Sequence, residues 1–140
     1  MKAWREECAV FGIWGDEEAG RMTYLGLYAQ QHRGQEATGI VNLQTDGSHY
    51  VHKGFGLVGE VFTEEHLEKM RGPAAIGHVR YSTTGENQLS NIQPLTANLN
   101  TGPVGLAHNG NIVNAEILKK QLKLEGAIFQ GPTGGILRGR

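Results

Sequence analysis

The chain has 140 residues, and its 13 basic and 14 acidic side chains leave a formal charge of −1. This length favours a single domain, and the balanced charge argues against a nucleic-acid partner. No apolar run approaches the roughly 18 residues of a membrane span, and residues 1–7 lack the apolar part of a secretory signal. The one cysteine, Cys8, cannot form an internal disulfide, so the chain fits a cytoplasmic protein with a reduced thiol and no membrane partner.

The first half of the chain predicts a strand, a helix and a hairpin, in that order. Residues 8–15 have the pattern of a buried strand. Residues 19–32 have helical spacing, and four of them are expected to form its apolar face: Met22, Leu25, Tyr28 and Ala29. Strands at 37–45 and 49–53 flank Asp46-Gly47, which is a strong hairpin signal. Thr63 is expected to cap a short helix that closes at Gly72-Pro73.

The second half alternates apolar segments with long polar ones. Residues 74–81 predict a strand, residues 84–102 a long polar loop, and residues 103–107 another strand. A helix is expected to begin at Asn111 or Asn114 and to end at Leu124, with an apolar side that makes ordinary core packing: Val113, Ile117, Leu118 and Leu122. Residues 127–130 begin a further strand. Residues 131–140 hold four glycines, one proline and two arginines, which predicts a disordered tail.

Cys8 is either a filler of the core or a thiol kept for its chemistry. Removal of residues 1–7 would give it a free α-amino group, whose pKa of about 7.7–8.0 suits a general base. Attack of the thiolate on an amide creates an oxyanion, which the Asn109 side chain and the Gly110 backbone N–H could stabilise. Arg80 could bind the carboxylate of an amino-acid substrate in a bidentate fork, and the Thr83 hydroxyl could add a hydrogen bond.

Each of these residues also has a structural interpretation. Arg80 could be a solvated arginine at a strand end, and Asn109-Gly110 could be a simple turn. We expect three histidines to be satisfied core or rim residues: His32, His78 and His108. A zinc site is disfavoured, because no cysteine or carboxylate accompanies the other histidines at ligand spacing.

Four motifs, at residues 8–13, 31–36, 77–83 and 107–111, resemble in sequence and order the glutaminase domain of the amidophosphoribosyltransferase family. The resemblance covers about residues 6–130. It implies an α+β fold, the four-layer αββα sandwich of N-terminal-nucleophile (Ntn) hydrolases, with antiparallel sheets and incomplete at the C-terminus. It also implies an enzyme that hydrolyses L-glutamine in the first committed step of purine biosynthesis. That step forms 5-phosphoribosylamine from glutamine and phosphoribosyl pyrophosphate.

By this resemblance, Cys8 is the nucleophile that takes glutamine as a thioester, and Asn109 and Gly110 form the oxyanion hole. Arg80 and Thr83 bind the α-carboxylate of glutamine, while residues 31–35 are structural. No cofactor or metal is implied within this part. Full-length relatives use Mg²⁺ and, in some, a 4Fe–4S cluster, and they are homo-oligomers.

The resemblance also implies a domain division and two departures from the family. Residues 1–7 resemble a propeptide, residues 8–130 a partial amidotransferase domain, and residues 131–140 an aberrant tail. The phosphoribosyltransferase half is absent, and no acid follows Glu125 where the family has an aspartate for the substrate's ammonium group. Two alternatives stay open: the glutaminase domain of another class II amidotransferase, and a non-catalytic truncated remnant whose uncovered sheet edges would aggregate.

Overall fold

The computed structural model describes residues 8–81, 88–110, 112–130 and 135–138. The chain divides into two compact units between Asn109 and Gly110. Every helix in the described ranges is too short or too polar to cross a membrane. The expected propeptide, residues 1–7, lies outside the described residues.

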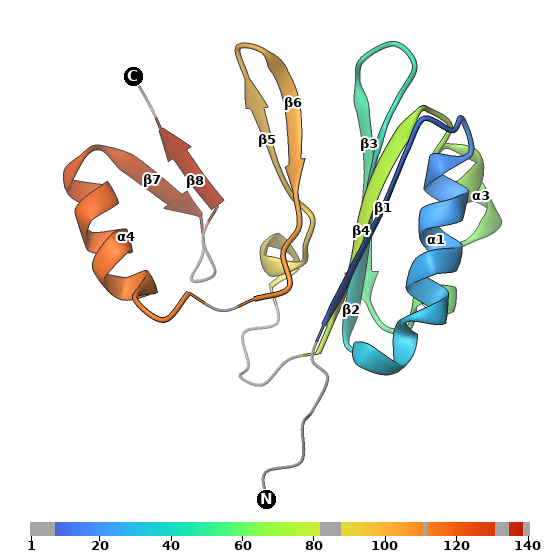
Figure 1. Ribbon diagram of the computed structural model, residues 1–140, viewed down its shortest axis with the longest axis horizontal. Helices are drawn as coiled ribbons and strands as arrows, with labels where there is room; N and C mark the ends of the chain where they lie inside the picture. Colours follow the sequence, from blue (N-terminus) through green and yellow to red (C-terminus); the bar gives the residue numbers. More distant parts are fainter. Residues whose placement is uncertain (1–7, 82–87, 111, 131–134, 139–140) are drawn as a thin grey trace, which may run out of the picture. The chain divides into compact units, whose positions relative to one another are not determined.

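The first unit is built on a four-stranded antiparallel sheet with the order β1-β4-β2-β3 (Figure 1). Its strands are β1 (Ala9–Trp14), β2 (Ala37–Leu43), β3 (His49–Phe55) and β4 (Ala74–Arg80). The predicted hairpin is confirmed, because β2 and β3 pair from Ala37↔Phe55 to Leu43↔His49. The antiparallel pairing fits the predicted α+β class.

One face of this sheet is covered by α1 (Ala19–Ala29), as Figure 1 shows. Three shorter helical elements lie between α1 and β4 in the chain: η1 (Gln31–Arg33), α2 (Val58–Val61) and α3 (Glu64–Glu68). The core on this side is a cluster of buried apolar side chains that includes Ala9, Leu27, Ile40, Val58, Phe62, Leu67, Met70 and Val79. Gly77 of β4 lets α1 approach, since a Cβ there would lie 2.6 Å from Leu27 Cδ1.

The predicted buried face of α1 is wrong. Met22, Leu25 and Tyr28 are 40%, 59% and 59% exposed. The helix instead buries Ala19, Gly20, Thr23 and Leu27. The physical reason is close approach: the face with smaller side chains can lie nearer to the sheet, and shape complementarity outweighs the hydrophobicity of the larger residues.

The other face of the sheet, which we call the second face, carries the hairpin of β5 (Leu95–Leu99) and β6 (Gly102–Leu106). β6 lies close to the sheet, because a Cβ on Gly105 would be 3.2 Å from Val41 Cγ1. Part of the expected polar loop is therefore a strand, and the 84–102 loop is wrong for residues 95–99. The polar Thr96 and Asn98 alternate with Leu95, Ala97 and Leu99, which is the period of a strand with one wet face.

The second unit contains α4 (Ala115–Leu124), β7 (Ala127–Gln130) and β8 (Gly135–Arg138). The expected core packing of the helix is wrong within the described residues, since α4 has no buried residue and Ile117 is exposed. Residues 135–138 were expected to be part of a disordered tail. They instead pair with β7 from Gln130↔Gly135 to Ala127↔Arg138, because pairing satisfies the backbone N–H and C=O groups.

Candidate active site

Cys8 immediately precedes β1, and its thiol is free and only partly buried. Its backbone has a φ of 63°, in the left-handed region that non-glycine residues seldom occupy. Residues held in such conformations cluster at functional sites. The conformation turns Cys8 away from the extended path of β1, at the point where the strand begins.

Two side chains from distant parts of the chain hold the main chain of Cys8. The Cys8 N–H donates to the Arg33 carbonyl at 3.1 Å, and Arg33 Nε donates back to the Cys8 carbonyl at 3.0 Å. Asn109 Nδ2 donates to the same carbonyl oxygen at 3.1 Å. Residues 8, 33 and 109 are thus brought together although up to 101 positions separate them in sequence.

Sequence reasoning missed Arg33, to which it assigned only a structural place within residues 31–35. Gly34 brings this segment against the end of β4, because a Cβ there would lie 2.7 Å from the Val79 carbonyl carbon. The motif at residues 31–36 singled out this segment, but its spacing carries no signal that the Arg33 guanidinium would meet the Cys8 carbonyl. That contact depends on the tertiary approach.

The thiol itself lies at the end of β4. Cys8 Sγ is 3.8 Å from the carbonyl oxygen of Tyr81. Tyr81 directly follows Arg80, the last residue of β4. The Arg80 carbonyl accepts the Glu36 N–H at 3.1 Å, which ties the strand end to the segment before β2. Since side chains alternate along a strand, Arg80 shares the second face with His78.

Of the other predicted site residues, Asn109 is brought to Cys8, as described above. Gly110 is the first residue of the second unit. A Cβ on Gly110 would meet no described heavy atom within 4 Å, so no protein contact requires a glycine there. Thr83 lies outside the described residues. The roles of Gly110 and Thr83 stay predictions.

His78 in β4 is 1% exposed, and neither ring nitrogen makes a well-formed hydrogen bond among the described residues. Burial is the main cause that lowers the pKa of His78 to about 4, and electrostatic repulsion from His108 adds to it. A polar contact with the main chain of His108 opposes the shift only in part. The expected core position of His78 is confirmed, but its ring is neutral and poorly partnered among the described residues rather than fully satisfied.

The described residues hold no group of three or more histidine, cysteine, aspartate or glutamate side chains that could bind a metal ion. A 4Fe–4S cluster is held by cysteine thiolates, and with Cys8 as its single cysteine this chain does not fit one.

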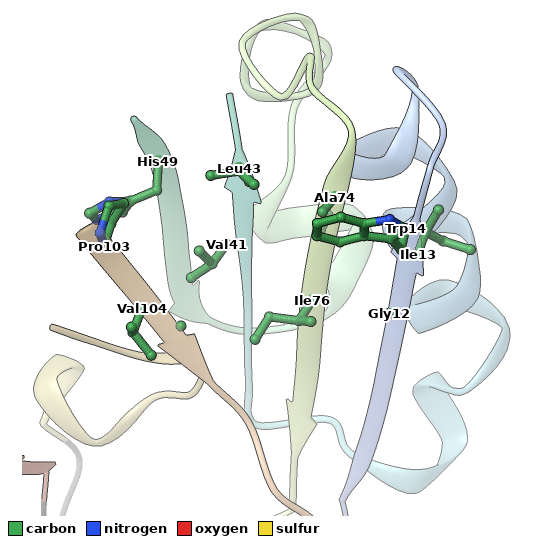
Figure 2. A pocket seen from close by; sticks show the side chains of 12 residues that line it. Gly12, Ile13, Trp14, Val41, Leu43, His49, Ala74, Ile76, Pro103 and Val104 are labelled. Atoms are coloured by element: carbon green, nitrogen blue, oxygen red, sulfur yellow. The ribbon is translucent and has the colours of Figure 1, made fainter. Parts of the chain in front are cut away.

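An open apolar cavity of about 390 Å³ lies on the second face of the sheet, and Figure 2 shows the side chains that line it. Its walls come from β1, β2, β3, β4 and β6 and include Trp14, Val41, His49, Ile76 and Val104. None of the predicted site residues lines this cavity. Its apolar character also sets it apart from a site for a charged amino acid, so it is not the candidate site.

No family model matches the chain. It is, however, 54% identical over 132 residues to the amidophosphoribosyltransferase of Bacillus subtilis (strain 168), a match that covers 93% of this chain and 27% of the relative. It is 52% identical over 130 residues to the amidophosphoribosyltransferase of Lacticaseibacillus casei, with 92% of this chain and 66% of the relative covered. A chloroplastic amidophosphoribosyltransferase of Arabidopsis thaliana is 53% identical over 125 residues, with 89% and 22% covered. The chain spans about a quarter of the length of the B. subtilis relative.

Solved structures give the same result. One, described as the allosteric regulatory enzyme of purine biosynthesis, matches with a TM-score of 0.80 and 53% identity over 86% of this chain and 26% of the other. A second is the glutamine phosphoribosylpyrophosphate amidotransferase of B. subtilis complexed with ADP and GMP, with a TM-score of 0.77 and 52% identity over the same shares. These neighbours confirm the predicted Ntn-hydrolase fold class.

Proposed function

Because the chain belongs to the amidophosphoribosyltransferase family, we propose that it carries the glutamine-hydrolysing part of such an enzyme. The ammonia released from L-glutamine would serve the formation of 5-phosphoribosylamine from phosphoribosyl pyrophosphate, the first committed step of purine biosynthesis. The observation that carries the proposal is the arrangement at Cys8. The Asn109 amide donates to the backbone carbonyl of Cys8, and the free Cys8 thiol lies next to the end of β4 that bears Arg80.

The reaction begins with the Cys8 thiolate, which attacks the side-chain amide carbon of glutamine. The C–N bond breaks, the leaving nitrogen takes up the proton that the base removed from the thiol and departs as ammonia, and a thioester remains. Water then hydrolyses the thioester, which releases glutamate and restores the thiol.

The base is the α-amino group of Cys8, which forms when water cleaves the peptide bond between residues 7 and 8. The Cys8 nitrogen lies 3.1 Å from the Arg33 carbonyl, and this hydrogen bond supports a fixed position for the amine. Since the base and the nucleophile belong to one residue, hydrolysis needs no cofactor or metal in this part of the protein.

Asn109 stabilises the oxyanion of the tetrahedral intermediate together with the Gly110 N–H. The support for Asn109 is that its amide already donates a hydrogen bond at Cys8, and preorganised donors of this kind contribute about 2.7–4 kcal/mol to catalysis. Arg80, and Thr83 with its hydroxyl, bind the α-carboxylate of glutamine. A guanidinium matches a carboxylate in a bidentate fork.

The remaining parts of the proposal concern the whole protein. We assign it to the cytoplasm and to a homo-oligomer, although plant relatives carry chloroplastic names. Its small-molecule partners would be L-glutamine and phosphoribosyl pyrophosphate.

The test is the intact mass of the purified chain before and after 6-diazo-5-oxo-norleucine, a glutamine analogue that alkylates a nucleophilic thiol. We expect loss of residues 1–7 and a single adduct on Cys8. The Cys8→Ala variant is the control and should gain no adduct. A folded chain that keeps residues 1–7 and does not react would overturn the proposal, as would an adduct that persists in Cys8→Ala.

A further inference from the structure

Asn109 belongs to a segment, residues 107–109, that has no regular secondary structure. A neighbouring side chain holds this segment: Gln93 Oε1 accepts the backbone N–H of His108 at 2.6 Å. The next residue is Asn109, which donates to the Cys8 carbonyl at 3.1 Å. A short chain of hydrogen bonds therefore runs from Gln93 through His108 and Asn109 to the candidate nucleophile.

Gln93 is itself held from both sides. Lys53 Nζ donates to the carbonyl of Ile92 and to the carbonyl of Pro94, each at 2.9 Å. Ile92 and Pro94 are fully buried, and burial lowers the pKa of Lys53. A half-buried ammonium group that bonds two carbonyls fixes the backbone on either side of Gln93, since charge-assisted hydrogen bonds are about twice as strong as neutral ones.

The sheet beneath leaves a gap for this segment. Gly39 of β2 pairs with Lys53 of β3 and with His78 of β4, so the three positions form a row across one face. A Cβ on Gly39 would collide with the Gln93 carbonyl oxygen. Gly39 thus lets the backbone of Gln93 contact the sheet. Lys53 lies on one side of this glycine and His78 on the other, and His78 interacts with His108.

We propose that Gln93 is a positioning residue that holds Asn109 in place beside Cys8, with Lys53 as the side chain that locks Gln93 to the sheet. The inference deepens the proposed function and rests on it. An oxyanion donor is useful only when it is fixed before the charge develops, and residues 107–109 lack the helix or strand that would fix it. The Gln93 side chain bonds the His108 N–H rather than Cys8, so it acts through Asn109.

The test compares three substitutions in the full 140-residue chain. Gln93→Met keeps the length of the side chain and removes the acceptor, and Gln93→Asn keeps the amide but withdraws it by one methylene. Gln93→Glu keeps an acceptor oxygen at the same distance. Gln88→Met is the matched control, because Gln88 is an exposed glutamine before η2 (Leu89–Asn91).

The first readout is the rate of alkylation of Cys8 by 6-diazo-5-oxo-norleucine, separated into the maximal rate and the half-saturating concentration. We expect Gln93→Met and Gln93→Asn to lower the maximal rate about 3- to 10-fold, the effect of losing one hydrogen bond, with little change in half-saturation. Gln93→Glu should stay within about threefold of the parent, and Gln88→Met should match it. Wild-type rates in Gln93→Met, or a change confined to half-saturation, would overturn the inference.

The second readout does not depend on reactivity. Amide hydrogen exchange should find the His108 N–H protected in the parent and in Gln93→Glu, and unprotected in Gln93→Met and Gln93→Asn. If the parent chain is folded but unreactive, the proposed function fails while this readout still decides the placement of Asn109. Equal protection of His108 in all variants would show that Gln93 does not hold the segment.

Discussion

Replacement of His78 by glutamine tests the most strongly perturbed group near the candidate site. In the folded chain, burial lowers the pKa of His78 from 6.5 to about 4. In the unfolded chain the ring is solvated and takes up its proton at the usual pKa. Between pH 4 and 6.5 the unfolded state therefore binds more protons than the folded state, so the free energy of unfolding falls as the pH falls.

The size of the effect follows from the two pKa values. The shift of about 2.5 units corresponds to roughly 3 kcal/mol in all, since one unit is about 1.4 kcal/mol. Above pH 6.5 His78 is neutral in both states, so its titration does not lower the free energy of unfolding. By pH 5 its protonation in the unfolded state has lowered that free energy by roughly 2 kcal/mol. This is a large part of the 5–15 kcal/mol typical of a folded domain.

The assay is urea unfolding of the parent and of His78→Gln at several pH values from 4.5 to 7.5, followed by far-UV circular dichroism. The difference in unfolding free energy between the two proteins should change by roughly 2 kcal/mol between pH 7.5 and pH 5. His32→Gln, which removes an exposed histidine of η1, is the control, and the pH dependence should persist in it. A His78 ring that titrates near pH 6.5 by NMR would refute the reasoning, as would an unchanged pH dependence in His78→Gln.

Two further predictions concern α1. Leu27→Ala should lower the free energy of unfolding by about 2–5 kcal/mol, because Leu27 is fully buried. Leu25→Ala on the exposed side should change that free energy by less than about 0.5 kcal/mol. Equal effects of the two substitutions in urea unfolding would contradict the assigned face. Gly20→Ala should lower the free energy of unfolding by about 1–3 kcal/mol, since the new Cβ would clash with Met70. This clash outweighs the gain of about 1 kcal/mol in helix propensity. A rise in the thermal midpoint of unfolding would show that Met70 can move aside.

The types of the regular elements were largely predictable, because they depend on residues close together in the chain. The Asp46-Gly47 turn predicted the β2–β3 hairpin, and the apolar run after Cys8 predicted β1. Two elements show where local reasoning stops. The side of α1 that is buried depends on the shape of the sheet at Gly77, and the strand β5 was hidden by the polar residues on its wet face.

The candidate site divides in the same way. Cys8, Asn109 and Arg80 were singled out from motifs, and the first two do meet. The parts that hold them were not foreseen. Arg33 and Gln93 act through hydrogen bonds to backbone groups 25 and 15 residues away, and such contacts follow no period in the sequence.

The sequence by itself determined which reactive groups are present: a single thiol near the start of a strand, and an amide and a guanidinium at the ends of two later segments. It also contained the local signals for helix, strand and turn. Only the tertiary structure decided how these groups are held and charged. In the folded chain Asn109 donates a hydrogen bond to the Cys8 carbonyl, and the Gln93 backbone packs against Gly39. Burial keeps His78 neutral. The physical reason is that desolvation and hydrogen-bond geometry depend on which distant residues come into contact, and that is known only when the sheet and the segments upon it are assembled.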